Sequence, residues 1–173
     1  MEKIVVSDTN IFIDLISVNL LDSFFSLPWE IHTTDMVIDE LIRSEQHEAI
    51  VHFRQNGGLK IKSFNGEELL QIVKMKSERP TSNASIQDCS VWKLAKDLEC
   101  ALLTGDNKLR KVVQNDNIEV HGILYLFDKM LEYGIMDNET AINKLRSLFC
   151  INSRLPKEEI GKRIALWKEA LKL

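Results

Sequence analysis

Short apolar runs alternate with longer amphipathic stretches along most of the chain. The runs lie at residues 4–6, 30–34, 59–64, 101–103 and 118–121. Most are rich in β-branched or other apolar residues, and apolar side chains at helical spacing follow them, which is the pattern of strand–helix units. Strands that alternate with helices predict a parallel central sheet with helices on both faces. The predicted fold class is therefore a three-layer α/β/α sandwich.

Helices are predicted over residues 9–24, 35–50 with a continuation to Phe53, 67–76, 85–98 and 107–114. After the last strand the chain is helical only, with helices predicted over 123–133, 138–149 and 157–172. These positions predict a first domain over residues 1–130. The C-terminal helical extension, residues 131–173, is expected to pack on the same domain.

Composition excludes some classes of protein. The 173 residues carry a formal net charge of −4, which argues against wholesale basic attraction to nucleic acid but leaves room for a local basic patch. The three cysteines, Cys89, Cys100 and Cys150, form no C-x-x-C pair, so buried free thiols and a reducing cytoplasm are expected. We expect no signal peptide and no membrane span, because no apolar stretch is long enough.

Two of the apolar runs deliver a carboxylate at the same place, directly after the strand. Asp8 follows Ile4–Val6, and Asp106 follows Ala101–Leu103 in the segment LLTGDNKLRK. Ligand sites in open parallel sheets lie at the carboxyl ends of the strands. Glu40, in VIDELIR, and Asp88, in the first turn of the helix over 85–98, follow other strands. We therefore expect the four acids to converge at one edge of the sheet.

Convergent carboxylates repel one another unless a cation neutralises them. Oxygen ligands suit hard divalent ions, so the expected cofactor is Mg²⁺ or Mn²⁺. Such an ion can activate water and polarise a phosphate, and phosphoryl transfer is the chemistry that fits this arrangement best.

Each acid alone has a simpler interpretation. Asp8 and Asp106 could cap the helices that follow them, and Asp88 could be a favourable first-turn acid on the helix dipole. Glu40 could be a solvated surface charge. Only the joint pattern favours a site.

The segments VVSDTNIFIDL, TTDMVIDELIR, SIQDCSVWKLAKDLECALLTGDNKLR and IEVHGILYLFDKML resemble those of the PIN-domain family. The resemblance runs through residues 4–131 and is greatest to VapC-type toxins and their longer relatives. It implies a compact α/β/α sandwich and a metal-dependent endoribonuclease that hydrolyses RNA phosphodiester bonds. For a toxin of a type II toxin–antitoxin pair, it also implies an antitoxin protein and a homodimer.

The resemblance assigns four catalytic acids by their motifs: Asp8, Glu40, Asp88 and Asp106. Asp39 adjoins Glu40, and a shift of the helix by one residue would exchange their roles, but the D-E-L match favours Glu40. We expect Asp8, Asp88 and Asp106 to be the metal ligands, with Glu40 placing a second ion or a water. Asn10 and Thr104 are expected to orient them as neighbouring polar groups.

An RNA substrate that approaches an acidic pocket needs cations nearby. Arg79, Lys108 and Arg110 are the predicted RNA-binding residues, because they flank Asp88 and Asp106. A solvated helix face is the alternative for each.

Two other functions remain open from the residues. One is a PIN-like module that binds RNA or protein without cleaving, although an intact set of four acids argues against it. The other is a haloacid-dehalogenase-type phosphatase, which also begins with an aspartate at a strand end. That chemistry needs a second aspartate two residues later, where this chain has Asn10.

Overall fold

A five-stranded parallel sheet forms the centre of the molecule in the computed structural model, which describes residues 3–41, 43–78 and 83–172. The strands are β1 (Lys3–Ser7), β2 (Trp29–Thr34), β3 (Leu59–Lys62), β4 (Ala101–Leu103) and β5 (Val120–His121). Their order across the sheet is β3-β2-β1-β4-β5, and every neighbouring pair is parallel. The predicted fold class is confirmed.

The apolar composition of β1 follows from its central position in the sheet. Val5 pairs with Ile31 on one side and with Ala101 on the other, and both Val5 and Val6 are fully buried. A strand covered on both faces needs apolar side chains pointing both ways, so β1 reads as an unbroken apolar run.

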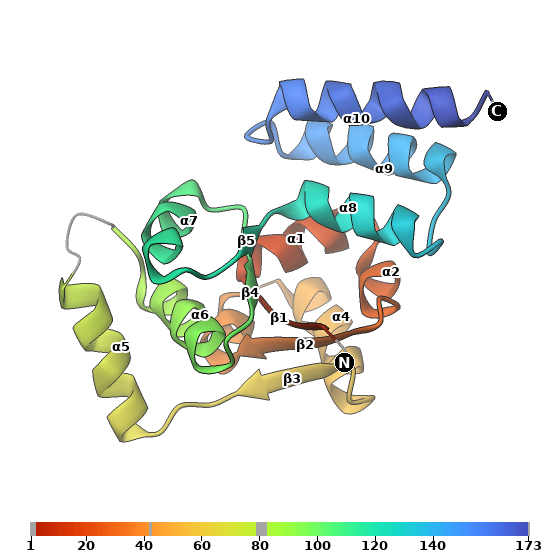
Figure 1. Cartoon of the computed structure of the whole chain (residues 1–173). Helices are drawn as coiled ribbons and strands as arrows, with labels where there is room; N and C mark the ends of the chain where they lie inside the picture. Colours follow the sequence, from red (N-terminus) through yellow and green to blue (C-terminus); the bar gives the residue numbers. More distant parts are fainter. Residues whose placement is uncertain (1–2, 42, 79–82, 173) are drawn as a thin grey trace.

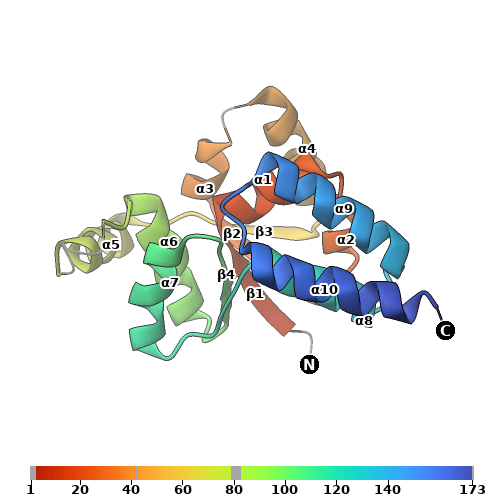
Figure 2. The same ribbon diagram turned by 90° about the horizontal axis from the view of Figure 1, so that it is seen from above.

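Helices cover both faces of this sheet. They are α1 (Thr9–Ser17), α2 (Leu21–Phe25), α3 (Asp35–Glu40), α4 (Ser44–Gln55), α5 (Gly66–Glu78), α6 (Ile86–Asp97), α7 (Asn107–Val113), the short 3₁₀ helix η2 (Gln114–Asp116), α8 (Ile123–Glu132), α9 (Asn138–Ile151) and α10 (Lys157–Ala170). Figure 1 shows their arrangement around the strands. Seen from above, α5, α6 and α7 lie on one side of the strands, and α1, α2, α8, α9 and α10 lie on the other (Figure 2).

The direction of the chain across the sheet reverses between β1 and β4. From β1 the chain proceeds to β2 and β3, and it then returns to the other side of β1 to form β4 and β5. The helix after β1 and the helix after β4 therefore leave toward different sides of the strands (Figure 2). Open parallel sheets form a crevice at such a switch point, outside the carboxyl ends of the strands.

Two predicted helices are each divided in the structure. The helix predicted over 9–24 becomes α1 and α2, because Asn19 adopts a left-handed conformation with φ of 53°. The helix predicted over 35–53 becomes α3 and α4, because Leu41 leaves the helical conformation with ψ of 73°. The second division has a consequence for the site, since it makes Glu40 the last residue of a short helix.

The C-terminal helices pack on the same body as the sheet. Helix α9 contacts α1 and α8, and α10 packs along α9. The guanidinium of Arg163 on α10 donates to both carboxylate oxygens of Asp128 on α8. The division into residues 1–130 and 131–173 remains a prediction.

All three cysteines are free, but only Cys89 is fully buried; Cys100 is partly buried, and the prediction of a buried thiol is wrong for Cys150, which is exposed. None of the helices in the described part of the chain is long and apolar enough to cross a membrane.

Candidate active site

Asp8 lies at the carboxyl end of β1, at the switch point of the sheet, and only 2% of its surface is exposed. Its Oδ1 accepts a hydrogen bond of 2.7 Å from the backbone N–H of Thr9, as the N-cap of α1. Its Oδ2 accepts hydrogen bonds from the Nδ2 of Asn10 and the Oγ1 of Thr104, both at 2.7 Å. Hydrogen-bond donors from the start of α1 and from the residue after β4 therefore fix this carboxylate.

The surroundings of Asp8 make its ionised form unfavourable. Burial, together with the negative charges of Asp88 and Glu40, raises the pKa of Asp8 to about 6. The hydrogen bonds from Thr104 and Thr9 lower the pKa but do not cancel these effects. Asp88 and Glu40 thus lie near enough to Asp8 to act on it electrostatically, although they come from other elements.

The turn after β4 joins Asp106 to Asp8 through Thr104. The backbone N–H of Asp106 donates to Thr104 Oγ1 at 3.0 Å, and the same hydroxyl donates to Asp8 Oδ2. The Oδ1 of Asp106 caps α7 by accepting from the backbone N–H of Lys108 at 2.6 Å. Asp106 is therefore a helix cap and a neighbour of Asp8 at once.

Gly105 allows this turn to approach α1 closely. Its N–H donates to Asn10 Oδ1 at 2.7 Å, and a Cβ at this position would lie 3.1 Å from the same oxygen. A side chain here would push Asn10 away from Asp8. The glycine of the T-G-D segment thus has a steric reason.

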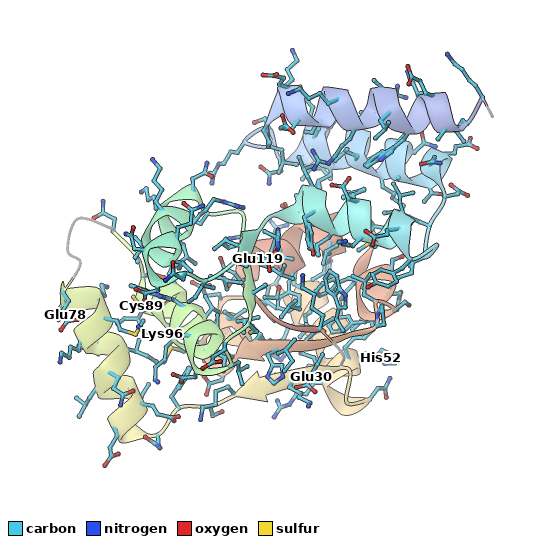
Figure 3. The ribbon with its side chains drawn as sticks, viewed as in Figure 1. Glu30, His52, Glu78, Cys89, Lys96 and Glu119 are labelled. Carbon is cyan, nitrogen blue, oxygen red and sulfur yellow. The ribbon has the colours of Figure 1, made fainter. Side chains whose placement is uncertain are left out.

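Asp88 and Glu40 are held by hydroxyl-bearing residues. Asp88 stands in the first turn of α6, where it forms a capping box with Ser85; its Oδ2 accepts from the Ser85 N–H at 2.7 Å, and its own N–H donates to Ser85 Oγ at 2.9 Å. Cys89, the next residue, is labelled on this helix in Figure 3. Glu40 ends α3, and its Oε2 accepts a hydrogen bond from the hydroxyl of Thr9.

The donor set suits a divalent cation. Within residues 3–41, 43–78 and 83–172, no hydrogen bond engages Asp88 Oδ1, Asp106 Oδ2 or Glu40 Oε1. These oxygens, with the oxygens of Asp8, are the hard ligands that Mg²⁺ and Mn²⁺ prefer. Across the same described residues, however, no three acidic, histidine or cysteine side chains stand so that they could hold an ion together without rearrangement. The predicted ligand set of Asp8, Asp88 and Asp106 remains a proposal.

The predicted RNA-binding cations have different surroundings. Lys108 is exposed beside Asp106. The guanidinium of Arg110 is turned inward, where it donates to the backbone oxygens of Val120 at 2.9 Å and Thr104 at 3.2 Å. Arg110 therefore ties β5 to the turn after β4, a role the sequence did not predict. Arg79 lies outside the described residues.

Sequence reasoning missed two residues of the site, Thr9 and Gly105, and it missed the pairing of Ser85 with Asp88. Thr9 belongs to the D-T-N segment and Gly105 to the T-G-D segment, so both residues lie within motifs that the sequence analysis identified. Their contacts were not identified, because Thr9 reaches Glu40 across 31 residues and Gly105 reaches Asn10 across 95.

A family model described as PIN domain (DUF3368) matches residues 4–169, nearly the whole chain. Among solved structures, PAE2754 from Pyrobaculum aerophilum is similar with a TM-score of 0.55 and 15% identity, over 76% of this chain and 99% of that one. SSO1118, a PilT N-terminus domain protein from Sulfolobus solfataricus P2, is similar with a TM-score of 0.52 and 15% identity, over 75% of this chain and 94% of that one. No curated protein sequence matches the chain significantly. At this identity the two structures show a shared fold, and the family match shows membership. The chain belongs to the PIN-domain family.

Proposed function

We propose that the protein is a metal-dependent endoribonuclease that hydrolyses RNA phosphodiester bonds. The observation that carries this proposal is the placement of Asp8. It is buried at the switch point of the sheet, it is fixed by the hydroxyl of Thr104, and it feels the charges of Asp88 and Glu40. Membership in a family whose fold is of the nuclease type supports the same conclusion.

In this proposal Asp8, Asp88 and Asp106 hold a Mg²⁺ or Mn²⁺ ion, and Glu40 orients the attacking water. The ion would neutralise the acids, activate water at neutral pH and stabilise charge on the phosphate. The products would carry a 5′-phosphate and a 3′-hydroxyl. Asn10 and Thr104 hold Asp8 in place, and their loss is expected to weaken metal binding.

The substrate's phosphates need a positive partner beside the acids. We assign this role to Lys108, which is exposed next to Asp106. Arg79 is a further proposed contact on the basis of its sequence position alone.

The decisive experiment compares the wild-type protein with Asp8→Asn. Wild type should cleave RNA with Mg²⁺ or Mn²⁺ and lose cleavage in EDTA, and Mn²⁺ should raise its melting temperature by mass action. Asp8→Asn should fold, cleave no RNA and show little stabilisation by Mn²⁺. Full activity of this variant would refute the assignment.

The alternative function is a PIN-like module that binds RNA or protein without cleaving it. It predicts RNA binding that is insensitive to EDTA, no cleavage, and no shift of the melting temperature with Mn²⁺. The same titration therefore separates the two functions.

A narrower proposal is that the nuclease is the toxin of a type II pair, with an antitoxin protein as partner and a homodimer as its assembly. The resemblance of its motifs to VapC-type toxins supports this. An RNA substrate and three free cysteines suit the reducing cytoplasm, where we place the protein. Growth arrest on expression, relieved by a small protein encoded beside the gene, is the expected result; growth unaffected by an active nuclease would contradict it.

A further inference from the structure

Thr9 contacts two acids of the site with two different groups. Its backbone N–H donates to Asp8 Oδ1 at 2.7 Å, and its hydroxyl donates to Glu40 Oε2. The side chain is largely buried, with 9% of the residue exposed. Thr9 is thus a direct link between the carboxylate after β1 and the carboxylate at the end of α3.

Glu40 depends on this link for its orientation. It is the last residue of a six-residue helix, and Leu41 after it is no longer helical. A glutamate side chain has several rotatable bonds, and Glu40 is only half-buried. Across the part of the chain that the structure describes, the hydroxyl of Thr9 is the hydrogen-bond donor that engages it.

Electrostatics alone would turn Glu40 away from the site. Asp8 and Asp88 carry the same sign of charge, so an unrestrained Glu40 lowers its energy by pointing into solvent. A hydrogen bond from a fixed hydroxyl to a charged carboxylate opposes this, because such bonds are stronger than those between neutral groups.

Within the described part of the chain, the hydroxyl of Thr9 makes no hydrogen bond other than the one to Glu40. Asp8, not Thr9, is the N-cap of α1, and Thr9 is the first helical residue. Removal of the hydroxyl would leave the cap of α1 and the backbone N–H bond to Asp8 in place. The contact with Glu40 can therefore be tested without loss of the helix.

We propose that Thr9 is a positioning residue that keeps the carboxylate of Glu40 directed toward Asp8 before any ion or RNA arrives. This inference rests on the proposed function, in which Glu40 orients the attacking water. It extends the proposed function by naming the hydroxyl group that holds Glu40 in the orientation needed for hydrolysis.

The test uses the full chain with Thr9→Val and Thr9→Ser. Valine keeps the shape of threonine without the hydroxyl, and serine keeps the hydroxyl. We expect Thr9→Val to lower kcat for RNA or the affinity for Mn²⁺, measured by calorimetry, by roughly 10- to 100-fold. Thr9→Ser should restore most of the loss, and KM for RNA should change little.

Three further measurements make the result specific. A crystal structure of metal-free Thr9→Val should show Glu40 turned to solvent. In a Glu40→Ala background, Thr9→Val should have almost no additional effect, because the side-chain oxygen that the Thr9 hydroxyl contacts is already absent. Ser17→Ala is the matched control, since the hydroxyl of Ser17, also on α1, bonds only to the backbone oxygen of Asp14 at 2.7 Å. It should leave kcat and Mn²⁺ affinity unchanged.

The inference is overturned if Glu40 keeps its orientation in metal-free Thr9→Val, or if Thr9→Val is as damaging in the Glu40→Ala background as in wild type. Failure of the proposed function looks different. A wild-type protein that cleaves no RNA contradicts the nuclease, while the metal-free crystal structure still decides whether Thr9 positions Glu40.

Discussion

Two buried carboxylates of the N-terminal segment, Asp8 and Asp14, have very different surroundings. Asp8 receives hydrogen bonds from a backbone N–H and two side chains, and two other acids act on it. Asp14, on α1, is 8% exposed, and among the described residues its carboxylate accepts hydrogen bonds from Asn152 alone, whose Nδ2 lies 3.1 and 3.3 Å from the two oxygens. Asp8 lies at the switch point of the sheet near two other acids, whereas Asp14 joins α1 to the end of α9.

Asp14 should make stability depend on pH. Burial raises the pKa of Asp14 above its ordinary value of 3.8, and the hydrogen bond from Asn152 lowers it by less. Its neutral form therefore stabilises the fold below about pH 4, and this contribution is lost as the pH rises through the folded-state pKa. At pH 7, Asp14→Asn should melt at a higher temperature than wild type, because the buried charge is gone while an oxygen remains for Asn152.

The measurement is thermal unfolding of both proteins between pH 4 and pH 7. The gap in melting temperature should narrow as the pH falls. A gap that is constant across this range, or an Asp14→Asn variant that melts lower at pH 7, would show that the Asp14 charge does not oppose folding.

At the scale of elements, the sequence predicted those features that depend on local pattern. The strand positions and the start of α6 at Ser85 follow from apolar runs and cap residues, and the structure confirms them. The divisions at Asn19 and Leu41 were not predicted, because the apolar pattern continues through both positions. Tertiary packing decides where these helices end, and the spacing of apolar residues carries no information about that packing.

The same difference applies to the candidate site. Asp8 and Asp106 could be placed together from the sequence, because each lies just beyond the carboxyl end of a strand and the two strands pair in one parallel sheet. The contact of Thr9 with Glu40 could not, since it depends on how α3 ends. The sequence named the acids and Thr104, whose hydroxyl holds Asp8, but it did not reveal that the hydroxyl of Thr9 holds Glu40.

The capping box of α6 gives a prediction at this scale. Ser85→Ala removes the acceptor of the Asp88 N–H and should cost about 1 kcal/mol of unfolding free energy. For a chain of this size the melting temperature should fall by roughly 2–4 °C. Because the cap fixes the turn that carries Asp88, Mn²⁺ affinity should fall as well.

Asp137→Ala is the matched control for Ser85→Ala. Asp137 caps α9 by accepting from the Thr140 N–H at 2.7 Å, and it belongs to the C-terminal helices rather than to the acidic site. It should lower the melting temperature by a similar amount without changing Mn²⁺ affinity. Equal Mn²⁺ affinities for the two variants would show that the capping box supports α6 but not the position of Asp88.

For the whole molecule, the open question is whether the C-terminal helices unfold with the sheet. Helix α10 is attached by apolar and charged contacts together. Ile160 and Trp167 are each 5% exposed, the Trp167 ring stacks on Phe127 with centroids 6.2 Å apart, and Arg163 pairs with Asp128. The family model extends to residue 169, so these helices belong to the shared architecture.

If α10 and the sheet form one cooperative unit, a cavity between α10 and the helices on which it packs should destabilise the whole protein. Trp167→Ala should cost about 3–5 kcal/mol, with a fall in melting temperature of roughly 6–20 °C in a single transition. Leu166→Ala, at a neighbouring position that is 64% exposed, should change stability by no more than about 0.5 kcal/mol. Calorimetry with and without Mn²⁺ checks this: if sheet and helices unfold together, each variant should show one transition, and an ion bound at the distant acids should move that whole transition to higher temperature. Two separate transitions in Trp167→Ala, with Mn²⁺ moving only the upper one, would instead make residues 131–173 an independent unit.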